Sequence, residues 1–225
     1  MPIEYKDVIP WGRSFEEYVA MFALRPEDLA GRIIGCGDGP AGFNKRMKDL
    51  GFKAISCDPI YTFSREQIKE RISVAKEEVM KQVFANMSCY VWDKIKNPAE
   101  LLRLRLETMD EFLADFESGK AEGRYLTYGL PDLPFSEKQF DLALCSHLLF
   151  IYSQHLGYDF HYKSIKEMLR VAKEVRIFPI IDLSSNRSPF LEPIIEHLQE
   201  EGHVVEIVRV DYEFHRGANE MMWIR

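Results

Sequence analysis

The chain has 225 residues, 46% of them apolar, and 29 basic against 36 acidic side chains give a formal net charge of −7. This composition supports a sizeable core and excludes general disorder. The longest uncharged apolar run, Leu142 to Tyr152, is shorter than the roughly 20 residues of a membrane span, and the first residues lack the order of a signal peptide. The acidic balance disfavours nucleic acid, which needs clustered Lys and Arg. We therefore expect a single cytoplasmic domain over residues 1–225, with no membrane or nucleic-acid partner.

The cysteines and histidines show no metal-binding pattern. Cys36, Cys57, Cys89 and Cys145 form no C-x-x-C pair and have no zinc-ligand spacing with the histidines. We expect free, mostly buried thiols in a reducing compartment, and no metal site.

Apolar runs alternate with helical patterns along the chain, which is typical of β-α-β units and a parallel sheet. Strands are predicted at 31–35, 52–57, 124–128, 140–145 and 175–181, with helices at about 41–50, 162–172 and 189–201. Pro179 lies inside the fifth strand, so that strand either ends earlier or contains a bulge. Residues 203–225 read as two strands joined by a short glycine-containing turn, which predicts an antiparallel hairpin.

About sixty residues separate the second and third strands, whereas a crossover needs only about a dozen. A capping box at Ser64 and the pair Asn97-Pro98 mark two helix starts in this segment. We therefore predict a helical insertion at residues 61–123. The aromatic-rich residues 1–30 are predicted to form an N-terminal helical cap over the sheet.

A glycine-rich turn, Gly35-Cys36-Gly37-Asp38-Gly39, follows the first predicted strand. Such glycines allow a tight turn and close backbone approach to a ligand. Asp58 ends the second strand, where an acidic side chain accepts both hydroxyls of a ribose. Turn and acid together predict a nucleoside-containing cofactor. Both the dinucleotide pattern, which continues to Gly42, and the G-x-G-x-G turn used for S-adenosylmethionine fit these residues.

Two later segments decide between these cofactors by resemblance. Tyr128 to Phe135 and Gln139 to His147 resemble the adenine loop and fourth strand of class I S-adenosylmethionine-dependent methyltransferases, and residues 165–173 are similar to the helix that precedes their fifth strand. The N-terminal PWGRSFEEY together with the glycine turn resembles an uncharacterised microbial subgroup of that superfamily. The resemblance implies an α/β, Rossmann-like, seven-stranded and mostly parallel sheet of order 3-2-1-4-5-7-6, with strand 7 antiparallel. It also implies methyl transfer from S-adenosyl-L-methionine to a small-molecule acceptor that the motifs do not identify.

The resemblance also assigns roles to residues. The cofactor-binding positions are Gly35, Cys36, Gly37 and Gly39 for the methionine part, Asp58 for the ribose, Pro59 and the Leu130 N–H for the adenine, and Ser146 beside the sulfonium. His147 is the candidate catalytic base, with a histidine hydrogen-bonded at the end of the strand as the structural alternative.

Two positions depart from the family pattern. An acid usually stands two residues before the first glycine, where this chain has Ile33, and an Asp usually begins the adenine loop, where it has Gly129. Asp38 and Asp132 are candidate substitutes. These departures keep a second function open, that of a non-catalytic nucleotide-binding protein.

Three further features have open interpretations. Arg13 is a candidate for the cofactor's carboxylate and His215-Arg216 for an anionic substrate, and each is equally consistent with a surface residue. Tyr90 and Lys94 have the spacing of a dehydrogenase pair but precede the third strand, so an NAD(P)-dependent oxidoreductase ranks below the other readings. Because the insertion at 61–123 leaves and rejoins the sheet at the cofactor rim, we expect it to act as a lid.

Overall fold

The sheet has the predicted strand order. The computed structural model describes residues 8–225, in which seven strands follow the order β3-β2-β1-β4-β5-β7-β6. The strands are β1 (Arg32–Cys36), β2 (Lys53–Cys57), β3 (Tyr125–Leu126), β4 (Phe140–Ser146), β5 (Ala172–Phe178), β6 (Val205–Arg209) and β7 (Glu220–Ile224). β7 runs antiparallel to β5 and β6, and the other pairs are parallel. This confirms the Rossmann-like α/β fold.

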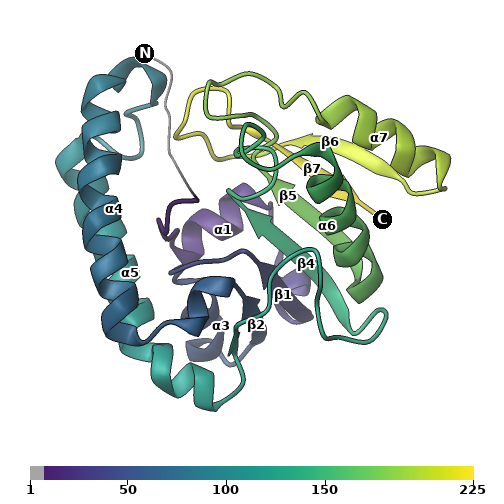
Figure 1. The fold of residues 1–225 in the computed structure, drawn as a ribbon, viewed down its shortest axis with the longest axis horizontal. Coiled ribbons are helices and arrows are strands. Elements are labelled where there is room, and N and C mark those ends of the chain that lie inside the picture. The colour runs from purple at the N-terminus through teal and green to yellow at the C-terminus, as the bar shows by residue number, and fades with distance from the viewer. Residues whose placement is uncertain (1–7) are drawn as a thin grey trace.

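Helices cover both faces of the sheet (Figure 1). They are α1 (Phe15–Met21), α2 (Pro26–Leu29), α3 (Phe43–Asp49), α4 (Arg65–Ala85), α5 (Pro98–Ala121), α6 (Tyr158–Val171) and α7 (Leu191–Glu200). One apolar core lies between the sheet and α6 and α7, and a second lies between the sheet and α1 and α3. The helices thus leave the carboxyl ends of the strands as the edge available for a site.

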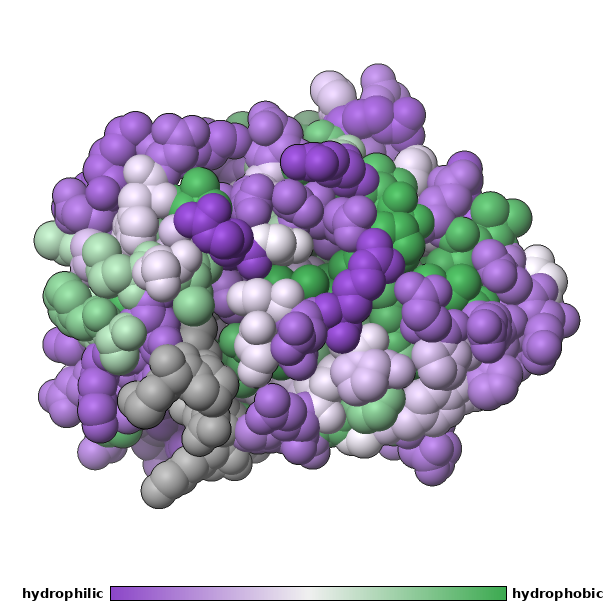
Figure 2. Space-filling model, turned by 90° about the horizontal axis from the view of Figure 1, so that it is seen from above, coloured by the Kyte–Doolittle hydropathy of each residue, from purple (hydrophilic) through white to green (hydrophobic). Residues whose placement is uncertain are grey.

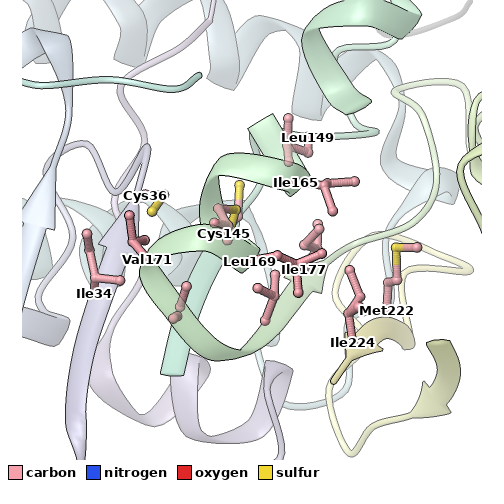
Figure 3. Close-up of a cluster of buried hydrophobic side chains, with 14 of the residues drawn as sticks. Ile34, Cys36, Cys145, Leu149, Ile165, Leu169, Val171, Ile177, Met222 and Ile224 are labelled. Carbon is pink, nitrogen blue, oxygen red and sulfur yellow. The ribbon is translucent and has the colours of Figure 1, made fainter. Parts of the chain in front are cut away.

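The alternation of apolar residues along each strand produces these two cores. Ile33 faces the core shared with α1 and α3, and Ile34 faces the core shared with α6, as successive side chains of a strand must. Figure 3 shows the α6 side, where Ile165 and Leu169 of the helix point toward Cys145 and Ile177 of the sheet. Their spacing of four residues places both side chains on one face of the helix.

Several boundaries differ from the predicted ones. β3 is only two residues long, and α6 begins at Tyr158, four residues earlier than predicted. β5 begins at Ala172 and ends at Phe178, so Pro179 follows the strand, which is the earlier-ending alternative. α7 begins at Leu191 because the Ser188 hydroxyl accepts from the N–H of Phe190 and holds the preceding turn. The hairpin connection, 210–219, is longer than the short turn predicted, and several of its residues contact other parts of the chain. For example, the Phe214 carbonyl accepts from Val91 N at 2.8 Å.

The segment between β2 and β3 contains the helices α4 and α5, which form an arm at one side of the sheet (left in Figure 1). Their starts are the predicted ones, with a capping box at Ser64 and an N-cap at Asn97. Arg105 of α5 is fully buried and forms a two-bonded ion pair with Glu17 of α1. This pair ties α5 to the body of the molecule. Among the helices of residues 8–225, none combines the length and apolar character needed to cross a membrane.

Candidate functional site

A cavity of about 1640 Å³ lies where the carboxyl ends of β1, β2 and β4 meet, and α4 forms its opposite wall. Drug-sized ligands occupy cavities of about 300–1,000 Å³, so this cavity is large enough for a cofactor and a second molecule. The predicted site residues that line it are Gly37, Gly39, Asp58, Pro59, Leu130, Ser146 and His147. Seen from above, hydrophilic side chains dominate this face of the molecule, and apolar groups show between them toward its middle (Figure 2).

The glycine turn brings bare backbone to the cavity. Gly37 has a φ of +73°, and a Cβ there would lie 2.5 Å from Leu148 Cδ2. Its N–H donates to the Cys57 carbonyl at 2.8 Å, which fixes the turn to β2. Gly39 has a φ of +54°. L-residues with side chains rarely adopt such angles, so both positions favour glycine, and the contact with Leu148 makes Gly37 the more restricted of the two.

Gly35 and Cys36 lie beneath the turn and do not line the cavity. Cys36 is fully buried. A Cβ on Gly35 would lie 1.9 Å from Asp38 Oδ2, because the Asp38 side chain folds back over the strand end. Both residues therefore shape the turn from below.

Asp38 places a buried carboxylate in the cavity wall. Tyr18 Oη donates to its Oδ1 at 2.9 Å, and Ser56 Oγ donates to its Oδ2 at 2.5 Å. Burial raises the pKa of Asp38 to about 6, against the lowering effect of these two hydrogen bonds. The group is therefore mostly ionised at neutral pH although it lies out of water.

Asp58 is held rigidly at the end of β2. Its Oδ2 accepts from Gly39 N and its Oδ1 from Ile60 N, both at 2.8 Å. Burial raises the pKa of Asp58 above its ordinary value. A carboxylate offers about four acceptor positions, so each oxygen keeps one for a ligand hydroxyl.

The adenine-loop departure has a steric cause. Gly129 lines the cavity, and a Cβ there would lie 2.7 Å from Cγ of Pro59, so an Asp at this position would collide with the proline ring. Asp132 is exposed and does not line either described cavity. Of the two candidate substitutes, Asp38 is therefore the one at the site.

His147 follows β4 with a φ of +55°, a conformation that few residues other than glycine adopt. Its N–H donates to the Phe178 carbonyl at 2.7 Å, and its Nδ1 lies 2.9 Å from Ser146 Oγ. Burial, with a smaller effect of the nearby Arg13 charge, keeps the pKa of His147 well below its usual range. The ring is therefore neutral at pH 7. In the tautomer that donates from Nδ1 to Ser146, Nε2 is free to accept a proton.

The segment before α1 crosses the glycine turn. This crossing was not predicted from the sequence, although a cap over the sheet was. A Cβ on Gly12 would lie 2.1 Å from the Pro40 carbonyl oxygen, and the Arg13 carbonyl accepts from Gly42 N at 3.0 Å. This close crossing brings Trp11 and Arg13 to the cavity. A glycine between two large residues, Trp11-Gly12-Arg13, is the sequence signal for it.

A second, smaller cavity of about 100 Å³ adjoins the first and shares Ile9, Trp11, Arg13 and His147 with it. The rest of its wall is mostly apolar and aromatic, and comes from α4, the segment after β4 and the β6–β7 connection. His215 belongs to this wall, where its Nε2 lies 2.9 Å from Ser185 Oγ.

This chain is similar in sequence to another protein over almost its whole length, and its fold is similar to those of more distant solved structures. No protein-family model matches. The uncharacterized protein MJ0045 of Methanocaldococcus jannaschii is 31% identical over 226 residues, which cover 99% of this chain and 98% of that protein. The magnesium protoporphyrin IX methyltransferase of Synechocystis PCC 6803, solved with bound SAM, is 12% identical with a TM-score of 0.48, over 93% of this chain and 76% of that one. A SAM-dependent methyltransferase of Aquifex aeolicus is 14% identical with a TM-score of 0.41, over 93% and 87% of the two chains.

Proposed function

This chain belongs to the same family as the Methanocaldococcus jannaschii protein, and we propose that it transfers a methyl group from S-adenosylmethionine to a small-molecule acceptor. The observation that carries the proposal is the joining of the glycine turn to Asp58 through the hydrogen bond from Gly39 N to Asp58 Oδ2. It supports a site in which bare backbone and a ribose-binding carboxylate lie side by side at the strand ends, where open α/β sheets bind ligands. The four free cysteines, three of them buried, suit a reducing compartment such as the cytoplasm.

The cavity fits such a cofactor residue by residue. We assign the backbone of Gly37 and Gly39 to the amino-acid part, the free acceptor positions of Asp58 to the ribose hydroxyls, and Pro59 with the Leu130 N–H to the adenine. Gly35 and Cys36 support the turn from below. The buried Asp38 carboxylate supplies the negative charge that the family carries at the position of Ile33, and we assign it to the cofactor's ammonium group.

When bound, S-adenosylmethionine supplies a methyl group on a cationic sulfur. Held by Gly37, Gly39, Asp58 and Pro59, it would supply this methyl group as an electrophile to the acceptor's lone pair. The protein's part is to align the two reactants. Where the acceptor atom carries a proton, we assign its removal to Nε2 of His147, with Ser146 orienting the ring.

The insertion at residues 61–123 is proposed as the cover of this site, and α4 is proposed as its moving part. α4 contributes a wall of the large cavity, whereas α5 is fixed by the buried Arg105–Glu17 pair. The N-terminal helical cap, proposed for residues 1–30, contributes Trp11 and Arg13 to the cavity.

An NAD(P)-dependent oxidoreductase is less consistent with the geometry. Tyr90 lines the small cavity, and the Lys94 ammonium donates to the Asp211 carbonyl at 2.9 Å on the surface. These two side chains therefore do not form a catalytic pair at the large cavity. The alternative is a non-catalytic nucleotide-binding protein. Such a protein would bind the cofactor in the thermal-shift assay described below but would show no turnover with any acceptor.

A thermal-shift panel with S-adenosylmethionine, S-adenosylhomocysteine, NAD and NADP tests the proposal. At one hundred times the dissociation constant a ligand adds about 2.7 kcal/mol to the free energy of unfolding, which corresponds to a rise in Tm of roughly 5–11 °C for a chain of this size. We expect this rise with S-adenosylhomocysteine and not with NAD, and its loss in Asp58→Ala. A rise with NAD alone would contradict the methyltransferase proposal.

A further inference from the structure

The two cavities meet at Arg13 and His147, which line both. The large cavity holds the predicted cofactor residues, whereas the small one contains none of those from the glycine turn or the end of β2. If the cofactor lies against the turn, the small cavity begins where its reactive end stops. The junction is therefore the place where an acceptor would meet the methyl group.

Arg13 brings an unpaired cation to this junction. One of its terminal nitrogens, Nη1, donates to the Trp11 carbonyl at 2.5 Å, and its Nε is buried without a hydrogen-bond partner among the described residues. The nearby Glu17 carboxylate is already bound by Arg105 and by the Tyr212 hydroxyl. Buried charges in proteins are normally paired. An arginine that leaves its Nε–H unsatisfied and has no carboxylate partner among the described residues therefore indicates a missing anion.

The two fully buried arginines of residues 8–225 each have a carboxylate partner, although Arg105 Nε, like Arg13 Nε, lacks a hydrogen-bond partner among these residues. Arg105 is paired with Glu17, and Arg176 is paired with Asp28 and Glu174. Arg13 instead acts electrostatically on the small cavity, where its charge contributes to lowering the pKa of both His147 and His215. The raised pKa values of Asp38 and Asp58 have other causes, chiefly burial. The charge of Arg13 therefore affects the two histidines of the small cavity, whereas it is not a cause of the shifts at Asp38 and Asp58.

The walls of the small cavity specify what else the ligand carries. Trp11, Tyr90 and Phe214 give it aromatic surface, and Val79, Leu101 and Ile151 give it aliphatic surface. Its volume of about 100 Å³ is below the roughly 150 Å³ of a cavity that binds benzene. The space therefore suits a group smaller than a benzene ring, such as a short branched chain.

We propose that the small cavity is the acceptor subsite and that it takes a small carboxylic acid, with the apolar body in the cavity and the carboxylate on Nε and the free terminal nitrogen of Arg13. The planar edge formed by these two nitrogens matches a carboxylate bidentately. This inference rests on the proposed function, since it takes the large cavity as the cofactor site. It gives Arg13 a different ligand from the cofactor's own carboxylate.

Isobutyrate and its neutral analogue isobutyramide test the proposal when each is titrated, by calorimetry or ligand-observed NMR, into protein saturated with S-adenosylhomocysteine. We expect isobutyrate to bind at least tenfold more tightly than isobutyramide, a difference of about 1.4 kcal/mol, and Arg13→Gln to abolish that preference. Arg13→Lys keeps the charge but not the planar edge, so we expect it to lose most of the preference. Arg103→Gln removes an exposed arginine of α5 and is the matched control, expected to change nothing.

Two further experiments identify the cavity in which the probes bind and the ligand whose carboxylate binds Arg13. Val79→Phe fills the small cavity from α4 without changing any charge, so it should weaken both probes at least tenfold. Arg13→Gln should leave the affinities for S-adenosylhomocysteine and for methylthioadenosine, which lacks the amino-acid part, unchanged within about twofold.

Several results would overturn the inference. Equal binding of isobutyrate and isobutyramide, or isobutyrate binding that survives both Arg13→Gln and Val79→Phe, excludes the subsite. An Arg13→Gln variant that loses S-adenosylhomocysteine but keeps methylthioadenosine shows instead that Arg13 holds the cofactor's carboxylate. If the wild type binds no S-adenosylhomocysteine, the proposed function itself has failed. We therefore measure S-adenosylhomocysteine binding before either probe is added.

Discussion

Asp38→Asn should make the protein more stable at neutral pH while it damages the site. Burial holds the pKa of Asp38 at about 6, above its ordinary value of 3.8. A raised carboxyl pKa favours the folded state when the group is protonated, so its contribution is complete below pH 3.8 and is lost as the pH rises through 6. At pH 7 the wild type therefore carries a destabilising buried charge that asparagine lacks.

The magnitude follows from the shift. Each pKa unit corresponds to about 1.4 kcal/mol, so the two units of Asp38 correspond to about 3 kcal/mol. The difference in free energy of unfolding, Asp38→Asn minus wild type, should rise by about 3 kcal/mol across the window from pH 3.8 to 6. Urea unfolding of both proteins over this pH range measures the difference. The other acidic side chains titrate alike in the two proteins, so their contributions cancel when one free energy of unfolding is subtracted from the other.

The same variant should bind S-adenosylhomocysteine more weakly, because the carboxylate assigned to the ammonium group is gone. Loss of a charged hydrogen-bond partner costs about 1.5–3 kcal/mol, which is roughly ten- to a hundredfold in affinity. Asp132→Asn makes the same change outside both cavities and should leave the affinity unaltered. A stability difference that does not vary with pH, together with undiminished binding, would refute the role given to Asp38.

Four other predictions concern further variants and the mobility of the insertion. Glu17→Gln leaves the buried Arg105 unpaired and should lower the free energy of unfolding at pH 7 by about 3–5 kcal/mol in urea unfolding. Because the pKa of Glu17 is lowered to about 2 from 4.5, the wild type should lose this contribution as the pH falls from 4.5 toward 2. A variant as stable as the wild type would show that the pair is unimportant. Asp58→Ala should weaken S-adenosylhomocysteine by about 1.5–3 kcal/mol in calorimetry, and unchanged affinity would remove Asp58 from the site. His147→Ala should keep that affinity and lower turnover of an acceptor that carries a proton by about 10²-fold, whereas full turnover would return it to a structural role. Amide exchange should be faster in α4 than in α5 and should slow in α4 when S-adenosylhomocysteine binds; equal protection of both helices without ligand would contradict a moving cover.

The sequence was sufficient for the features that depend on local pattern. Alternating apolar residues and glycine punctuation predicted the strands, and the resemblance to class I methyltransferases supplied their order. Asp58 was predictable from its spacing to the turn, and Asn97 and Ser64 from capping chemistry.

Features that depend on contacts between distant segments were not predictable. Asp38 folds back onto Gly35 because Tyr18 and Ser56, from α1 and β2, hold its carboxylate, and spacing alone does not reveal such partners. The assignment of Gly35 and Cys36 to the cofactor missed this, since the motif marks a turn without showing which residues face the ligand. The small cavity is likewise assembled from segments as far apart in the chain as Ile9 and Phe214.

A crystal structure of the protein with S-adenosylhomocysteine tests the central claim most directly. We predict density in the large cavity, with the ribose hydroxyls on Asp58, the amino-acid part against Gly37 and Gly39, and the sulfur directed toward His147 and the mouth of the small cavity. Density for the ligand elsewhere, or none in crystals soaked well above the dissociation constant, would contradict it.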